Sequence, residues 1–329
     1  MPYKSPLEPI LRARGAVYGR VGDAEVPLHF GDPAAEIEAL RTGPAAVDLG
    51  WRALVEVTGR DRVRFVHGMC TQDVKGMAPG QGRAAAAVTR QGKMVADLVV
   101  RMHPDRLSLE TDRAALPALL ETFTKFIVAD DVRLDVSSRT AIGRYGPGTA
   151  PARPARPFDW TELEDGSWVC KDPTLGVEGY VRWTPPEATP AFGGERWAGF
   201  QAWETLRIEN GFPRWGADMG PDVLPMEAGL EPIAISYSKG CYVGQEVIQR
   251  VKTYSEPPKM LVQLEVTGAQ PGERILAGGQ DIGHVTSATP RVALGYVRKE
   301  FKNPGTEVSV GSRRAVVRAL PWQVRGATA

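Results

Sequence analysis

The sequence predicts an α+β fold that ends in a small all-β unit. Over most of the chain, short alternating runs typical of strands are interspersed with segments of helical periodicity. After Pro257-Pro258 only short strands separated by glycine-containing turns remain, which is the pattern of a small β-sandwich or barrel. A chain of 329 residues is too long for one ordinary core, so two or three domains are expected.

The N-terminal elements alternate between helix and strand. Asp32-Pro33 supplies an N-cap and a proline at the first helical position, so residues 34–41 should form a short helix. Residues 54–57 alternate and stop at Thr58-Gly59, which predicts a strand. The next predicted elements are, in order, a helix over 61–69, a hairpin over 84–101 with its turn at 90–92, a strand over 107–111, an amphipathic helix over 116–127 and a strand over 132–136.

The second half contains two irregular segments and one clear helix. Residues 146–157 and 184–194 are rich in proline and should be loops, the first of which crosses between units. A helix is expected over 200–210, with Gly211 in the C′ position. The strands of the C-terminal unit are predicted at 261–266, 293–297, 307–310 and 315–319.

The composition excludes several classes of protein. A net charge of +1 gives no electrostatic case for nucleic acid or an anionic membrane as a partner. No apolar run is long enough to cross a bilayer, and the first residues lack an apolar signal core, so a cytoplasmic location is expected. Three cysteines far apart and four histidines without ligand spacing predict neither a disulfide framework nor a self-contained metal site.

One cysteine stands in an unusual setting. Cys241 lies in the octapeptide Lys239-Gly240-Cys241-Tyr242-Val243-Gly244-Gln245-Glu246, with a glycine on each side of it. Glycines there indicate a sharp turn or a close approach, and the charge of Lys239 would lower the pKa of a neighbouring thiol. The alternative is a small buried cysteine beside a turn.

Two carboxylates occupy positions where the pattern predicts a buried face. Glu209 shares a helix face with Ala202 and Leu206, so it needs a partner, either in a salt bridge with Arg214 or Arg250 or in a ligand. Asp97 projects to the same strand face as its second neighbours on each side, and the pattern does not decide whether that face is covered. Nearby aromatic side chains either stack on a planar ligand or pack in the core, and these are Tyr18, Trp51, Trp203, Trp215 and Tyr237.

The octapeptide resembles the signature of the YgfZ-type tetrahydrofolate-binding proteins, in the superfamily of the glycine-cleavage aminomethyltransferase (T-protein). The similarity runs over nearly the whole chain, through the segments 55–61, 71–74, 79–81, 92–98, 206–216 and 224–230. It implies a three-unit aminomethyltransferase-like ring around a central folate channel, with a C-terminal β-barrel. The implied domains are a folate-binding domain of residues 1–50 plus 140–255, an inserted α+β domain of residues 51–139 and the barrel of residues 256–329.

The resemblance also implies a ligand, tetrahydrofolate or a one-carbon derivative, and roles for six residues. Glu209 falls at the position that binds the pterin, whose amino group and ring N–H match two carboxylate oxygens. Asp97 falls at or next to the catalytic carboxylate of an Asp-Asp pair, the first member of which is Ala96 here. Cys241 is the expected functional thiol, and Arg250, Tyr237 and Lys239 are expected to help bind the folate.

The resemblance favours one function over two alternatives. T-proteins carry an aspartate-phenylalanine pair where this chain has Cys241-Tyr242, whereas the cysteine form implies an accessory protein in iron–sulfur cluster assembly or repair. Its partners would be iron–sulfur client enzymes such as radical-SAM proteins. The chain departs from that group at 251–255, which contains none of the group's histidines. The alternatives are a folate-dependent aminomethyltransferase or methyltransferase, with Asp97 as its acid, and a scaffold whose folate site has become a packed core.

Overall fold

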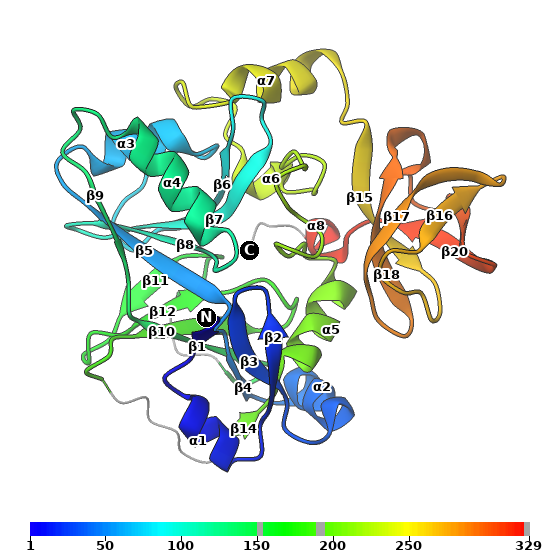
Figure 1. The fold of residues 1–329 in the computed structure, drawn as a ribbon, viewed down its shortest axis with the longest axis horizontal. Coiled ribbons are helices and arrows are strands. Elements are labelled where there is room, and N and C mark those ends of the chain that lie inside the picture. Colours follow the sequence, from blue (N-terminus) through cyan, green and yellow to red (C-terminus); the bar gives the residue numbers. More distant parts are fainter. Residues whose placement is uncertain (150–153, 189–194, 326–329) are drawn as a thin grey trace.

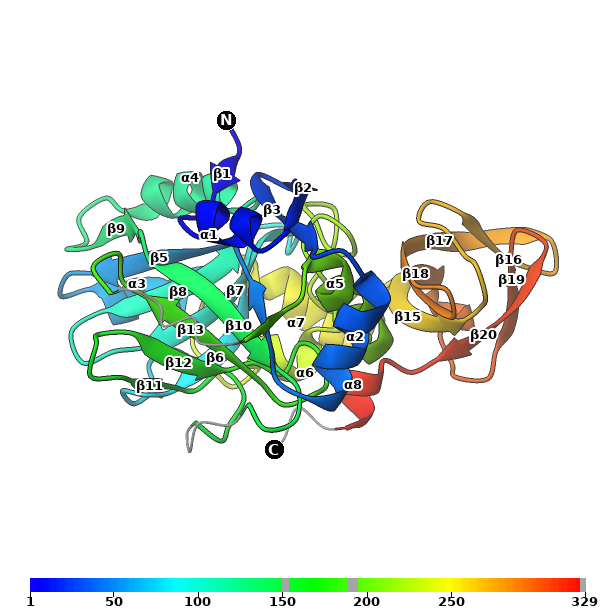
Figure 2. The same cartoon turned by 90° about the horizontal axis from the view of Figure 1, so that it is seen from below.

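The computed structural model describes residues 1–149, 154–188 and 195–325. Figure 1 shows three lobes, with a C-terminal barrel set apart from two sheet-containing lobes, and Figure 2 shows the barrel projecting from the side of the other two. Helices and strands are mixed throughout the first two lobes, so the predicted α+β class with a terminal barrel is confirmed.

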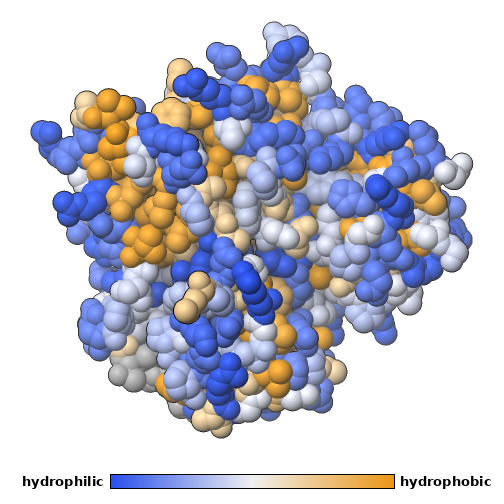
Figure 3. Space-filling model, viewed as in Figure 1, coloured by the Kyte–Doolittle hydropathy of each residue, from blue (hydrophilic) through white to orange (hydrophobic). Residues whose placement is uncertain are grey.

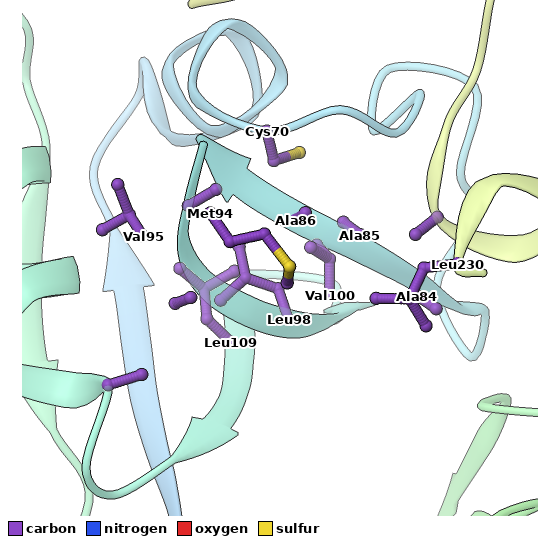
Figure 4. Packing of buried hydrophobic residues seen from close by; sticks show 14 of the residues in the cluster. Cys70, Ala84, Ala85, Ala86, Met94, Val95, Leu98, Val100, Leu109 and Leu230 are labelled. Carbon is purple, nitrogen blue, oxygen red and sulfur yellow. The ribbon is translucent and has the colours of Figure 1, made fainter. Parts of the chain in front are cut away.

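The first lobe contains a five-stranded sheet in the order β6-β7-β8-β5-β9. Leucine, valine and methionine side chains of one sheet face pack against α3 and α4 and form the largest core of the protein. Figure 4 shows Met94, Leu98 and Val100 of β7 in this core, beside Cys70 at the end of α3. The elements are β5 (Arg52–Thr58), α3 (Arg62–Met69), β6 (Gly82–Val88), β7 (Met94–Met102), β8 (Leu107–Asp112), α4 (Leu116–Phe126) and β9 (Arg133–Val136).

The second lobe is built on a six-stranded sheet in the order β11-β12-β13-β10-β4-β14, beside a three-stranded sheet in the order β1-β3-β2. The Asp32 side chain caps α2 by accepting from the N–H groups of Ala34 and Ala35, as the sequence predicts. The elements of this lobe are β1 (Tyr3–Lys4), α1 (Glu8–Ala13), β2 (Val17–Val21), β3 (Ala24–His29), α2 (Pro33–Thr42), β4 (Ala45–Asp48), β10 (Thr140–Tyr145), β11 (Trp160–Glu162), β12 (Trp168–Lys171), β13 (Gly179–Thr184) and β14 (Arg196–Trp197).

Helix α5 (Phe200–Asn210) joins this lobe to the rest of the molecule. It lies alongside α2 and ends at Gly211, whose φ of 77° is the left-handed conformation expected of a C′ glycine. Two further helices follow, α6 (Glu231–Ala234) and α7 (Gln245–Tyr254), with the predicted signature loop between them. Helix α7 was not predicted, because its apolar stripe is short and only Ile248 on it is buried.

The C-terminal unit is a closed barrel in the order β15-β18-β17-β16-β19-β20. Closure distinguishes it from the sandwich that the pattern equally allowed. After the barrel the chain turns back, and Trp322 of α8 packs on Phe212 with ring centroids 5.4 Å apart. The elements are β15 (Lys259–Glu265), β16 (Arg274–Ala277), β17 (Gln280–Ala288), β18 (Val292–Arg298), the 3₁₀ turn η1 (Lys299–Phe301), β19 (Glu307–Val310), β20 (Arg313–Arg318) and α8 (Pro321–Val324).

Several strands are absent from the predicted set. Strands β11 to β13 and the barrel strands β16 and β17 were missed, because they are short or interrupted by glycine and polar residues. The predicted loops at 146–157 and 184–194 lie partly outside the described residues. In the described part of the chain, no helix combines the length and the apolar character needed to span a bilayer.

Candidate active site

A cavity of about 90 Å³ lies where the two sheets, α5 and the loop after it come together. One buried water needs about 10–15 Å³ by this kind of measure, so the cavity has room for several waters or for part of a ligand. Two more open hollows, of about 520 and 230 Å³, adjoin it, and all three are lined by Phe158 and Ile233. The three hollows therefore neighbour one another at these two side chains.

The polar wall of the cavity is one face of the five-stranded sheet. Side chains alternate along a strand, so Asp97, Val99 and Arg101 of β7 point to the same side, away from α3 and α4. The register places Glu110 of β8 opposite Val99. Strand β6 presents only glycine and alanine on this face, at Gly82, Ala84 and Ala86, which leaves open space above the sheet.

Asp97 lines the cavity and is held in place from three sides. Its Oδ2 accepts from Nη1 of Arg52 at 2.8 Å, and its Oδ1 accepts from the Asp112 N–H at 3.3 Å and the Thr111 hydroxyl at 3.5 Å. The sheet face that the sequence left undecided is therefore covered, with the Asp97 side chain 18% exposed. This is a carboxylate fixed by a cation at the wall of a cavity, a geometry suited to acid–base work on a bound ligand.

The cation beside Asp97 belongs to a longer series of ion pairs. Nε of Arg52 also bonds Oε1 of Glu110 at 3.0 Å, and the other oxygen of Glu110 accepts from Nη2 of Arg101 at 2.8 Å. Burial alone would raise the pKa of Glu110, but the two guanidinium groups outweigh it and bring this pKa below its usual value. Both arginines and Glu110 were missed in the sequence as site residues.

Asp112 provides a second carboxylate next to Asp97. It is 3% exposed, and its side chain accepts from the Ala114 N–H at 3.0 Å. Burial, assisted by the negative charge of Asp97, raises the pKa of Asp112 to about 6. A signal for this residue was present in the sequence, because β8 alternates leucine with polar side chains and so shows one apolar and one polar face.

Aromatic rings form the opposite wall. Trp51 contacts Trp203 and Phe200 edge-on, with ring centroids 4.9 and 5.0 Å apart. Trp51, Trp203 and Trp215 line the cavity, as a stacking role requires. The other two predicted aromatics, Tyr18 and Tyr237, do not line it.

A buried charge cluster fixes the end of α5 beside the cavity. The Arg207 side chain is fully buried and pairs with Asp218 and with Glu204, while Arg214, which lines the cavity, bonds Glu204 at 3.0 Å. Arg207 also donates to the Ser287 hydroxyl of β17 at 2.7 Å. The cluster therefore links α5, the cavity wall and the barrel.

Comparisons with known proteins decide the family. The pattern of the GCVT N-terminal domain matches residues 7–148, and that of the glycine cleavage T-protein C-terminal barrel domain matches residues 259–323. Together the two matches cover more than half of the chain. The chain belongs to the GcvT-like family.

Relatives of similar length carry the name of an enzyme. An aminomethyltransferase of Thermosynechococcus vestitus is 27% identical, over 96% of this chain and 93% of its own length. The mitochondrial aminomethyltransferase of Gallus gallus is also 27% identical, over 97% and 92%. The crystal structure of an aminomethyltransferase of the glycine cleavage system from Bartonella henselae superposes with a TM-score of 0.89 at 23% identity, covering 98% of each chain, which shows the shared fold.

These findings overturn the function expected first. Several relatives that match over nearly the full chain are named as aminomethyltransferases, and none of these names refers to iron–sulfur cluster assembly or repair. The prediction of an accessory protein with iron–sulfur clients is therefore wrong, and the similarity supports the GcvT-like family without the YgfZ-type subgroup. The octapeptide covers eight residues, whereas the match to an aminomethyltransferase covers 96% of the chain.

Glu209 lies away from the cavity of this GcvT-like protein. Its two oxygens accept from Nη2 of Arg41 at 2.7 and 2.6 Å, and its side chain is 37% exposed, so the predicted buried position is wrong. Helix α2 packs beside the last turns of α5 and brings Arg41 to their edge, which draws the carboxylate outward. Neither of the two arginines proposed from the sequence, Arg214 or Arg250, is its partner here.

The signature loop also lies outside the cavity lining. Cys241 is exposed, and Lys239 points away from it into the protein, where it donates to the carbonyls of His67 and Cys70, the latter at 2.7 Å. Lys239 is thus an internal brace between this loop and the end of α3. The charge of Lys239 is therefore directed toward these carbonyls and not toward the Cys241 thiol.

The remaining predicted ligands are likewise placed elsewhere. The Tyr237 hydroxyl donates to Glu231 at 3.0 Å, and Lys252 of α7 pairs with the same carboxylate at 2.6 Å. Arg250 lies on the exposed side of α7. Of the six residues predicted from the sequence, only Asp97 is brought into the cavity.

Proposed function

We propose that this protein is a folate-dependent one-carbon transferase of the aminomethyltransferase type, with Asp97 as its acid. The observation that carries the proposal is the position of Asp97, held by Arg52 at the wall of the central cavity. The full-length relatives named as aminomethyltransferases support the reaction class.

The carboxylate pair suits the departure of an amine. An amine that leaves a carbon atom takes up a proton, and a carboxyl group beside it supplies that proton or stabilises the positive charge. The Asp112 N–H donates to Asp97, and the pKa of Asp112, raised to about 6 by burial and by the charge of Asp97, makes Asp112 a neighbouring carboxyl group that holds a proton just below neutral pH. Asp112 thus contributes the second carboxylate that Ala96, on the opposite sheet face, does not provide.

The aromatic wall suits the pterin ring of tetrahydrofolate. Trp51, Trp203 and Trp215 offer flat apolar surface opposite the polar sheet face, so a planar ring has stacking partners on one side and hydrogen-bonding groups on the other. The hollows that meet at Phe158 provide a route for the rest of the ligand toward the surface.

The test combines binding and turnover in the full-length protein. Calorimetric titration with 5-formyl-tetrahydrofolate should show saturable binding, and an aminomethyl donor with tetrahydrofolate should yield methylene-tetrahydrofolate. Asp97→Asn keeps the size of the side chain and should lower turnover by about 100-fold or more while folate still binds. Cys241→Ser is the matched control and should retain turnover. Absence of folate binding by the wild type would remove the proposal.

A further inference from the structure

Arg101 carries hydrogen-bonding capacity that the protein does not use. It is 2% exposed, and Nη2 bonds Glu110 at 2.8 Å, but Nε and Nη1 are buried without a hydrogen-bond partner. The side chain also lines the central cavity. A buried guanidinium N–H without an acceptor is costly, so a ligand that brings an acceptor to Arg101 would be stabilised there.

Among the described residues, none accepts a hydrogen bond from Nε or Nη1 of Arg101. From the facing sheet, the buried thiol of Cys170 on β12 interacts electrostatically with Arg101, and burial raises the pKa of this thiol to about 12. A neutral thiol is a weak acceptor and does not balance a guanidinium. The Cys170 thiol therefore does not replace the acceptor that Nε and Nη1 of Arg101 lack.

The charged residues of the cavity lining can be assigned to partners. Among the described residues that line it, the anions are Asp97, Glu110 and Asp172, and the cations are Arg52, Arg101, Lys171 and Arg214. Arg52 is shared between two carboxylates, and Asp172 is engaged by the hydroxyl of Tyr145 at 2.6 Å. Arg214 is neutralised by Glu204. With Arg101 paired to Glu110, formal charge in the lining is balanced, and what stays unmet is the hydrogen-bonding capacity of Arg101 Nε and Nη1.

We propose that Arg101 binds a carboxylate of the ligand that enters this cavity, so that the substrate class is a carboxylic acid. The inference rests on the proposed one-carbon transfer and adds the group by which the substrate is held. Two sources supply this chemistry, the glutamate tail of a folate and a second, small amino-acid substrate. A guanidinium–carboxylate bond would satisfy the free N–H groups and would fix one end of the ligand relative to Asp97.

Paired ligands distinguish the sources. We would titrate the full-length protein calorimetrically with 5-formyl-tetrahydrofolate and with 6-methyl-tetrahydropterin, which lacks any carboxylate. In parallel, N-methylglycine would be compared with its uncharged amide. The variants are Arg101→Gln, which removes the charge, and Arg101→Lys, which keeps the charge but lacks the planar donor geometry of the guanidinium. Arg106→Gln, in the turn after β7 and outside the cavity lining, is the control for loss of an arginine.

A positive result has a specific form. Arg101→Gln should weaken binding of the carboxylate-bearing ligand by about 10- to 100-fold, Arg101→Lys should be intermediate, and Arg106→Gln should match the wild type. The ligand without the carboxylate should bind all four proteins equally. If only the affinity for the folate depends on Arg101, the bound group is the glutamate tail. If only the affinity for N-methylglycine depends on Arg101, the bound group is the carboxylate of a small substrate.

Two results would overturn the inference. One is equal affinity of the wild type and a folded Arg101→Gln variant for every carboxylate ligand, which would mean that water fills the space beside Arg101. The other is absence of any carboxylate binding by the wild type. If 5-formyl-tetrahydrofolate still binds and its affinity does not depend on Arg101, the inference fails but the proposed transferase function stands. The failure of one can therefore be told from the failure of the other.

Discussion

The guanidinium of Arg52 joins two carboxylates, donating to Asp97 at 2.8 Å and to Glu110 at 3.0 Å from the same buried face of the sheet. Arg52 begins β5, while its two partners stand on β7 and β8. The site therefore depends on the strand register, because a shift by one residue would turn these side chains to the opposite face.

Removal of this cation should destabilise the protein. Arg52→Gln leaves the buried Asp97 without a positive partner and removes one of the two guanidinium groups that pair with Glu110. Such a loss typically costs about 3 kcal/mol or more. Urea denaturation at pH 7.5 measures the loss. Because the uncompensated carboxylates are the cause, Arg52→Gln with Asp97→Asn should recover part of it. If Arg52→Gln alone were as stable as the wild type, the central role of Arg52 would be contradicted.

Asp112 should make stability depend on pH. Its pKa is raised in the folded protein, so the folded state binds more protons than the unfolded state between pH 4 and 6, and stability from this group falls as pH rises through that range. Asp112→Asn removes the effect. The free energy of unfolding of the variant, relative to that of the wild type, should therefore rise by about 2 kcal/mol from pH 4.5 to pH 7.5. Asp105→Asn changes an exposed carboxylate and should show no such gain.

Glu209→Ala should have little effect on either stability or folate affinity. Both partners of the Arg41–Glu209 pair are more than one third exposed, and such pairs contribute about 0–1 kcal/mol. Calorimetric titration of Glu209→Ala alongside Trp203→Ala tests the placement, since only Trp203 lines the cavity. A large loss of affinity in Glu209→Ala alone would show that this carboxylate reaches the ligand after all.

Phe158 should control access to the cavity. It lines all three hollows, and among the described residues it is the one non-glycine residue with positive φ, at 69°. Its carbonyl lies so close to Gly82 that a Cβ there would be 2.0 Å away, so the position is fixed by the neighbouring strand. Phe158→Ala and Phe158→Gly should both accelerate folate association in stopped-flow measurements.

The same two variants separate backbone strain from side-chain size. Alanine retains the left-handed penalty and glycine does not, so Phe158→Gly should be more stable than Phe158→Ala by about 1 kcal/mol. Thermal denaturation of the two proteins provides the comparison. Equal stability would indicate that the backbone relaxes once the ring is removed.

The sequence was a good guide to the elements and a poor guide to the site. Capping at Asp32, the C′ glycine at 211 and the alternation of the strands 54–57 and 107–111 depend on local chemistry, which a linear pattern contains. The direction of Glu209 depends on Arg41, which lies 168 residues away. The inward turn of Lys239 depends on carbonyls of α3, and no local pattern reports such partners.

The contacts of Arg207 have a consequence for how this protein can change. Four side chains in series, those of Arg214, Glu204, Arg207 and Ser287, connect the cavity wall to a barrel strand, and Asp218 accepts from Ser287 at 2.8 Å and from Thr286 at 2.5 Å. The barrel therefore supports the cavity wall through buried hydrogen bonds. Substitutions at Thr286 or Ser287 should therefore change the position of Arg214 in the cavity wall. A barrel taken from a relative should support activity only if it carries hydroxyl groups that make the same contacts with Arg207 and Asp218.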